Sequence, residues 1–228
     1  MKGDVVPDSG SSSAAVPLPR GRHKLSADEV RASQRARLLQ AMEELVDELG
    51  YAGASVPKVV RRARVSDRTF YSLFADKADC FIAVCEQLGD GLRELMTQSV
   101  AGIADVDDPF RAFDEGLTQY LDLWAQRPAA SWAYFVELPA VGERAFESRD
   151  GRAALFAEAL RRIGIALRDR AGIAGEPSTI EATAAAAVAV ELVAREVRAR
   201  RIDTLQSIHH DLHHVLLLLL LGRAPDGC

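Results

Sequence analysis

The chain has 228 residues, 48% of them hydrophobic, which is enough to bury the core of one or two domains. Its formal net charge is −5, but residues 20–77 hold 12 Lys/Arg against 8 Asp/Glu, whereas residues 78–228 hold 15 against 23. Positive charge concentrated at one end is typical of a protein that meets a polyanion there. The longest apolar run, Val215 to Leu221, is far shorter than the roughly 20 residues of a membrane span, and the N-terminus lacks the apolar stretch of a signal peptide. We therefore expect a cytoplasmic protein with no membrane partner.

Residues 1–19 are rich in Ser, Pro, Gly and Ala and show no period, which is typical of disorder. A basic tract, Arg20 to Lys24, follows directly before the first predicted helix. It is either an arm that reaches into the minor groove of DNA or a run of solvated charges. We expect residues 1–24 to form a disordered segment that ends in this basic arm.

The next segments predict three helices. Ser26 and Glu29 have the spacing of a capping box, and the helix that they begin continues to about Leu49. Ser55 and Ser66 each precede a short run with apolar residues at helical spacing, which predicts two short helices joined by a tight turn. Since their polar residues lie opposite the apolar ones, the pair is typical of a helix-turn-helix, whose second helix enters the major groove of DNA.

At this point the chain resembles the DNA-binding domain of the TetR (tetracycline-repressor) family of transcriptional regulators, over about residues 31–80. Four features carry the resemblance: the pair Gly50-Tyr51, the helix start Ser55-Val56, the turn Ala63-Arg64-Val65-Ser66, and the signature from Thr69 through Tyr71 and Phe74 to Lys77.

Two residues depart from the family pattern. Arg64 stands where the family usually has the turn glycine, so a left-handed conformation there would carry a strain cost. Arg68 stands where a small residue is common on the recognition helix. Both add positive charge near the expected DNA face, so they bear on which DNA sequence is preferred.

The outward positions and the resemblance together predict a DNA-binding surface. Arg68 is the candidate for base readout, because a guanidinium bridges both acceptors of guanine; a phosphate contact or an ion pair with Asp67 are the alternatives. Asp67 is either a favourable charge at the helix N-terminus or an acceptor for cytosine. The resemblance implies phosphate or thymine-methyl contacts for Thr69 and Tyr71 and a phosphate contact for Lys77. The predicted DNA-binding residues are Ser55, Arg64, Ser66, Asp67, Arg68, Thr69, Tyr71, Ser72 and Lys77.

From Lys77 onward every segment reads as helix. The expected helices cover 77 to about 100, Pro109 to just before Pro128, a short aromatic segment ended by Pro139, about 143–171, Ser178 to about 201, and Thr204 to Gly222. Because no alternating pattern predicts a strand, we expect an all-α fold. We place the helix-turn-helix DNA-binding domain at residues 25–76 and a larger helical effector-binding and dimerisation domain at 77–228.

The C-terminal helices predict a dimer. The helix from Ser178 carries a stripe of small residues, and the run from Val215 to Leu221 is apolar all round, so it must be covered on both sides. The resemblance implies a homodimer that places two recognition helices about one DNA turn apart, or a multiple of it, on a palindromic operator; a self-contained monomer core is the alternative. The candidate interface residues are Ala182, Ala185, Ala186, Ala189, Val193, Leu212, Leu216 and Leu219.

Aromatic residues gather in the middle of this second domain. The resemblance implies a pocket for a small apolar or aromatic effector there, with ordinary core packing as the alternative. The candidate pocket residues are Phe113, Tyr120, Trp124, Trp132, Tyr134 and Phe135.

The remaining chemistry-bearing residues predict no cofactor and no metal. The three cysteines, Cys80, Cys85 and Cys228, are expected to be ordinary thiols, with redox sensing as the alternative. His209, His210, His213 and His214 form two i,i+4 pairs, a spacing that suits either a metal or a polar patch at a helix start or dimer rim.

The function favoured by the sequence is a DNA-binding transcriptional regulator, a homodimeric repressor released from its operator by an effector. The alternative is an interaction protein that keeps the fold and binds another protein. We do not expect an enzyme, because the sequence has no Gly-rich phosphate loop, nucleophile elbow or paired metal motif.

Overall fold

The computed structural model describes residues 26–103 and 106–222. The predicted basic arm at 20–24 and Cys228 lie outside these residues. Within the described ranges every regular element is a helix, so the all-α prediction is confirmed. The elements are α1 (Ala27–Gly53), α2 (Val56–Ala63), α3 (Asp67–Leu73), α4 (Lys77–Ile103), α5 (Pro109–Ala125), α6 (Pro128–Trp132), a π-helical turn (Ala133–Glu137), a 3₁₀ turn (Leu138–Val141), α7 (Glu143–Arg170), α8 (Thr179–Arg198), a 3₁₀ segment (Ile202–Ile208) and α9 (His209–Leu221).

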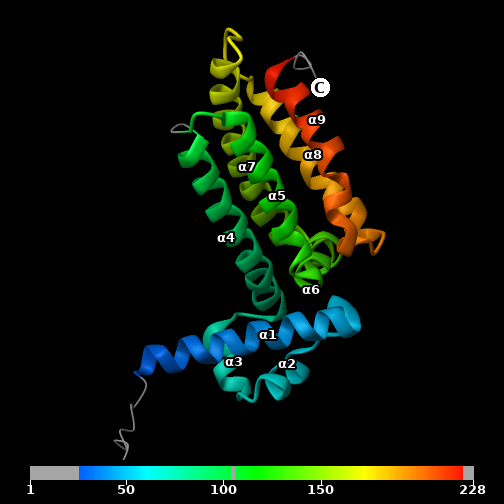
Figure 1. Ribbon diagram of the computed structural model, residues 1–228. Helices are drawn as coiled ribbons and strands as arrows, with labels where there is room; N and C mark the ends of the chain where they lie inside the picture. The colour runs from blue at the N-terminus through cyan, green and yellow to red at the C-terminus, as the bar shows by residue number, and fades with distance from the viewer. Residues whose placement is uncertain (1–25, 104–105, 223–228) are drawn as a thin grey trace, which may run out of the picture.

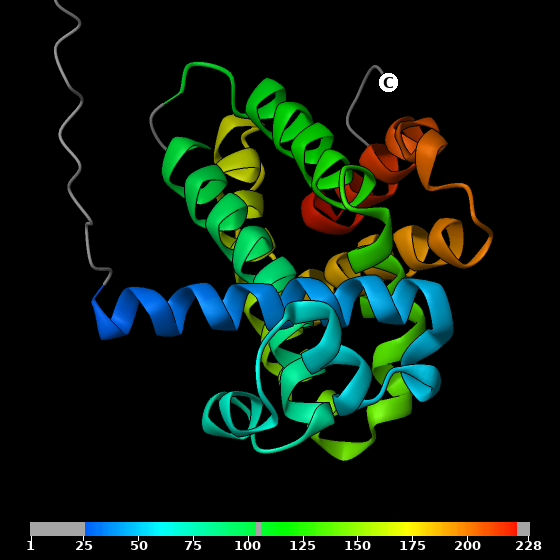
Figure 2. The ribbon, with the colours of Figure 1, turned by 90° about the horizontal axis from the view of Figure 1, so that it is seen from below.

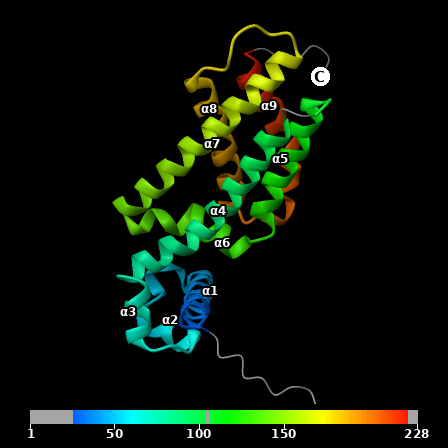
Figure 3. The ribbon, with the colours of Figure 1, turned by 90° about the vertical axis from the view of Figure 1, so that its left-hand side faces the viewer.

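The helices form two groups. Helices α1, α2 and α3 lie together at one end of the molecule, and α4 runs from them into the larger helical group (Figure 1). Seen from below, α1 crosses this end as one long helix, with α2 and α3 next to it (Figure 2). Helix α7 crosses the larger group obliquely and packs against both α4 and α8 (Figure 3). Helices α8 and α9 lie side by side.

The helix-turn-helix is held by a small apolar core. Leu38 and Met42 of α1 are fully buried, as are Val59 of α2 and Phe70 of α3. Phe74 is also buried, and its ring centroid lies 5.7 Å from that of Phe70. The apolar faces that the sequence predicts for α2 and α3 therefore point into this core and leave their polar faces outward.

Most predicted helix ends are found, because a cap depends on residues only three apart. Ser26 and Ser178 both form complete capping boxes, and the Asp108 carboxylate accepts the Arg111 N–H at 3.2 Å. The last helix ends at Gly222, which has a left-handed φ of 71°.

Two helix boundaries and one capping contact differ from the prediction. Helix α1 continues past Leu49 to Gly53, with a break at Gly50, whose φ is 70°. Ser55 occupies the N-cap position of α2, but its side chain makes no capping hydrogen bond in the described structure. Thr204 does not cap the last helix: it lies inside the 3₁₀ segment, where its hydroxyl donates to the Arg201 carbonyl at 3.1 Å, and α9 begins at His209.

Candidate nucleic-acid interface and effector groove

The exposed face of the helix-turn-helix carries arginines that have no ionic partner. Arg61, Arg64 and Arg68 are exposed and form no ion pair with any residue in the described ranges. Arg62 differs, because its guanidinium pairs with Glu48 at 2.7 Å. The ion pair between Arg68 and Asp67 that the sequence leaves open is therefore not formed. Exposed guanidinium groups without a carboxylate partner are what a polyanion binds.

The polar residues of α3 divide into two sets. The Ser66 hydroxyl accepts the Thr69 N–H at 3.1 Å and shares a hydrogen bond with the Thr69 hydroxyl at 2.9 Å, so this pair caps the helix. The Ser72 hydroxyl donates to the Thr69 carbonyl at 2.8 Å. The other set points outward: Asp67 and Arg68 are exposed, and Tyr71 is 60% exposed. The second set is therefore the part of α3 free to meet bases.

Arg64 adopts the conformation for which the family uses glycine. Its φ is 53° and its ψ is 48°, and its N–H donates to the Arg61 carbonyl at 3.3 Å. Arg64 therefore bears the strain cost that a left-handed conformation carries for a residue with a side chain.

Lys77 is engaged within the chain. Its Nζ donates to the Tyr51 carbonyl at 2.9 Å and lies 3.9 Å from the centroid of the Tyr51 ring. The same ring lies 4.9 Å from that of Phe81 on α4. Lys77 therefore joins the start of α4 to the end of α1, and its predicted phosphate contact remains a prediction.

Glu137 links the larger helical group to Tyr51, near the end of α1. Its carboxylate accepts the Tyr51 N–H at 2.9 Å and the Trp132 Nε1–H at 3.3 Å. A further ion pair joins Arg144 to Asp76 at 2.9 Å. Sequence reasoning missed these contacts, because nothing local marks a glutamate whose partner lies far away in the chain.

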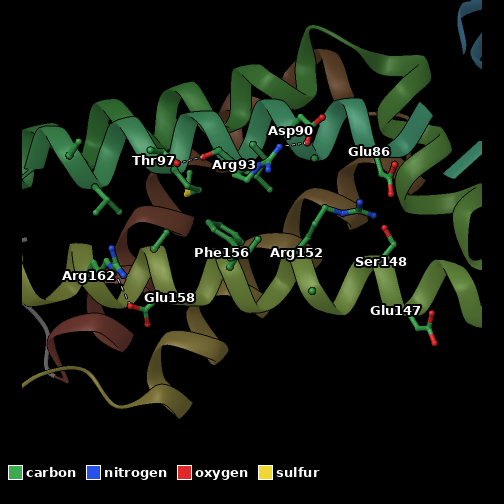
Figure 4. Close-up of a pocket in the computed structure, with 18 residues that line it drawn as sticks. Glu86, Asp90, Arg93, Thr97, Glu147, Ser148, Arg152, Phe156, Glu158 and Arg162 are labelled. Carbon is green, nitrogen blue, oxygen red and sulfur yellow. Dashed lines mark hydrogen bonds and ion pairs between the residues drawn. The ribbon is translucent and has the colours of Figure 1, made fainter. Parts of the chain in front are cut away.

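A groove of about 780 Å³ lies between α4 and α7 (Figure 4). Its apolar lining includes Met96 and Val100 of α4 and Leu155 and Phe156 of α7. Met96 and Phe156 also line a second cavity of about 30 Å³ deeper in the bundle. The two cavities are thus separated by these two side chains.

The predicted aromatic pocket is only partly found in these cavities. Phe113 and Tyr120 line the inner one, where burial raises the pKa of Tyr120 and its hydroxyl has no partner among the described residues. The other four predicted residues line neither of the two cavities. The Trp124 ring is tilted against those of Phe135 and Tyr134, with centroids 4.6 and 5.3 Å away, and the Trp132 Nε1–H donates to Glu137. The groove residues of α4 and α7 were missed.

The predicted dimer residues lie mostly inside the single chain. Seven of the eight are buried, and only Leu219 is half-buried; the buried ones are Ala182, Ala185, Ala186, Ala189, Val193, Leu212 and Leu216. The accessible face of α8 is formed by other residues, including Ile180, which is 81% exposed. The homodimer remains a prediction, and a partner would meet the accessible residues first.

The four histidines at the start of α9 differ in exposure, and the two described cysteines are buried. His209 Nε2 lies 3.2 Å from the Thr118 hydroxyl and 3.5 Å from the Asp114 carboxylate, while His210 and His214 are exposed. Across the described ranges no three His, Cys, Asp or Glu side chains are grouped to hold a metal ion. Burial raises the pKa of both Cys80 and Cys85 to about 12, so both are protonated thiols at neutral pH.

The described helices include none that is both long and apolar enough to span a membrane. This finding agrees with the exposed charges along the long helices α4 and α7.

Comparison with known proteins confirms the resemblance seen in the sequence. Residues 38–84 match the model of bacterial regulatory proteins of the tetR family, a range that contains all of α2 and α3. No curated protein matches the chain.

Solved structures of similar fold include transcriptional regulators. The fatty acid degradation regulator FadR from Bacillus halodurans is 18% identical, with a TM-score of 0.64 over 81% of this chain and 94% of that one. FadR from Bacillus subtilis, in complex with stearoyl-CoA, is 18% identical, with a TM-score of 0.64 over 82% and 98%. A TetR-family regulator from Pectobacterium atrosepticum is 20% identical, with a TM-score of 0.62 over 86% and 98%. The chain thus has the fold of TetR-family transcriptional regulators.

Proposed function

We propose that this protein is a sequence-specific DNA-binding regulator, a homodimeric repressor that leaves a palindromic operator when a small-molecule effector binds. The observation that carries the proposal is the set of unpaired, exposed arginines Arg61, Arg64 and Arg68 on a helix-turn-helix face. The match to the tetR family model over the same residues supports it.

Arg68 is the residue that we propose for base readout. It is the second residue of α3, and the first turns of a recognition helix come closest to base edges in the major groove. A bidentate guanidinium–guanine contact contributes roughly 1–3 kcal/mol of discrimination against a wrong base. Tyr71, one turn further along and largely exposed, is placed to contact a phosphate or a thymine methyl.

The start of α2 suits a phosphate. Ser55 is the N-cap residue, and its hydroxyl makes no capping hydrogen bond in the described structure, so it is free to donate to a ligand. The N–H groups of a first helical turn bind anions together with the positive end of the helix dipole. A phosphate at this position would set the register of the recognition helix without reading sequence.

The groove between α4 and α7 supports control by an effector. A ligand there touches α4, whose first residue, Lys77, is bound to Tyr51 at the end of α1. A ligand that favours one position of α4 would therefore shift the helix-turn-helix, provided that its affinity differs between the two positions. The similar structure of Bacillus subtilis FadR holds stearoyl-CoA, so this fold accommodates an effector.

The test is DNA binding by the full chain, measured by fluorescence anisotropy on duplexes footprinted upstream of its own gene. We expect binding that weakens steeply with salt. Arg68→Ala should lower the preference for the operator over mutated duplexes by about tenfold or more, whereas Arg149→Ala, which removes an exposed arginine of α7, should leave it unchanged. If no duplex binds better than random DNA, the proposal fails and a protein-interaction module becomes the better hypothesis.

A further inference from the structure

One half-buried arginine of the effector groove, Arg152, has two buried guanidinium nitrogens without a hydrogen-bond partner among the described residues. Arg152 projects from α7 toward α4 (Figure 4), and its buried Nε and Nη2 donate to no hydrogen-bond acceptor within the described ranges. The guanidinium carbon Cζ lies 5.4 Å from the centroid of the Tyr134 ring, so its described neighbour on that side is an aromatic face. A buried cation of this kind is costly unless an acceptor completes it.

The neighbouring helix leaves room for this side chain. Opposite Arg152, α4 has Gly89, and a Cβ at that position would lie 2.5 Å from Arg152 Cδ and 3.2 Å from its Nε. Any larger residue would push the guanidinium away. Glycine is unfavourable inside a helix, but at position 89 it leaves the space that the Arg152 side chain occupies.

The other arginines of the groove are neutralised. Arg93 pairs with Asp90, and Arg162 pairs with Glu158 at 2.9 Å. Two further acids, Glu86 and Glu147, line the groove but are exposed and form no ion pair with Arg152 in the described structure. Arg152 is therefore the cation with which an incoming anion would pair.

The remainder of the groove is apolar and elongated. Met96, Val100, Leu155 and Phe156 line it, and Leu155 is 59% exposed although it is a large hydrophobic side chain. Arg162 follows Arg152 by ten positions on α7, a span of about 15 Å along the helix. A hydrocarbon chain along this strip would cover apolar surface that otherwise faces water.

We infer that the groove binds an amphipathic anion, with a carboxylate on Arg152 and a hydrocarbon chain along Met96, Val100, Leu155 and Phe156. This inference names the chemical class of the effector. It rests on the proposed function only where it implies that binding of this ligand releases the protein from DNA. A purely apolar ligand would fill the strip but leave the guanidinium without an acceptor, and a small hydrophilic anion would leave the strip exposed.

The test compares decanoate with decanol, which share a chain and differ in charge. Binding to the full-length protein is measured by isothermal calorimetry at concentrations below micelle formation. We expect decanoate to bind at least about tenfold more tightly, as a charge-assisted pair gives. Arg152→Met should abolish that preference while keeping affinity for decanol, which also shows that the variant is folded. Arg162→Met, at the other end of the groove, should keep the preference.

Equal binding of decanoate and decanol by the wild-type protein would overturn the inference, and so would a preference that survives in Arg152→Met or the absence of binding by either probe. Failure of the proposed function looks different. If the protein binds no operator, the decanoate preference is still measurable and still depends on Arg152. If it binds an operator but decanoate neither binds nor releases it, the DNA-binding proposal stands and the ligand class is wrong.

Discussion

Replacing Arg64 by glycine should stabilise the protein and weaken its DNA binding at the same time. Arg64 is held at a φ of 53° in the turn between α2 and α3. The left-handed region costs a residue with a Cβ roughly 1–2 kcal/mol, and glycine avoids this cost. Glycine in turn loses roughly 0.5–1 kcal/mol more conformational freedom on folding. The net expectation for Arg64→Gly is a gain of about 0.5–1 kcal/mol.

The matched control is Arg64→Ala. Alanine keeps the Cβ and therefore the strain, while it removes the same exposed guanidinium. For a chain of this length, 1 kcal/mol corresponds to about 2–4 °C in Tm, so Arg64→Gly should melt about 1–4 °C above Arg64→Ala. Calorimetric melting of the two variants and of the wild type measures this difference. Equal Tm values for the glycine and alanine variants would refute the argument from backbone strain.

Both Arg64 variants should lose the same amount of DNA affinity. If the guanidinium contacts a phosphate, removing it lowers the slope of log K against log salt by about 0.9 for each bound chain. A salt titration by fluorescence anisotropy gives that slope. An unchanged slope in both variants would show that Arg64 meets no phosphate, whatever its effect on stability.

Three further predictions rest on individual contacts. Lys77→Met removes a charged hydrogen bond and a cation–π contact, so urea unfolding should show a loss of about 2 kcal/mol, and an unchanged midpoint would contradict this. Burial lowers the pKa of His213 in the folded chain, so the unfolded chain binds more protons and the free energy of unfolding falls as the pH drops below about 6.5. His213→Gln should flatten this part of the curve of stability against pH. An identical curve for the variant would exclude His213 as the source of the pH dependence. Burial raises the pKa of Cys80 and Cys85 to about 12, so at pH 8 their thiolate fraction is about a thousandfold below that of a free thiol. In a Cys228→Ser variant, a thiol reagent should therefore label these two cysteines only after the protein unfolds.

The sequence predicts the helices well because their signals are local. The capping boxes at Ser26 and Ser178 involve side chains three residues apart, and the apolar faces of α2 and α3 repeat within one or two turns. The same reasoning fails at Thr204, whose residue type suits a cap although its φ of −111° belongs to an irregular 3₁₀ segment. The residue type permits a cap at Thr204, but the connection between α8 and α9 determines where the last helix begins.

Features that depend on distant segments could not be predicted. The periodicity of α8 shows an apolar stripe that includes Ala185 and Val193, but it does not tell whether the same chain or a partner covers it; within one chain both are fully buried. The groove is likewise invisible in either helix alone. The close fit of Arg152 against Gly89 depends on how α4 packs against α7, which neither helix sequence shows by itself.

The pairing of arginines explains how an acidic chain presents a face for DNA. In the larger helical group many arginines form ion pairs with carboxylates: Arg161 pairs with Glu158, and Arg201 pairs with Glu196. On the helix-turn-helix only Arg62 is used in this way, and the arginines on either side of it are unpaired within the described ranges. Since exposed charges are screened beyond about 8 Å at physiological salt, distant carboxylates cancel little of the local field. The charge that a phosphate meets is therefore set by which cations lack a partner nearby, and the net charge of the chain has little bearing on it.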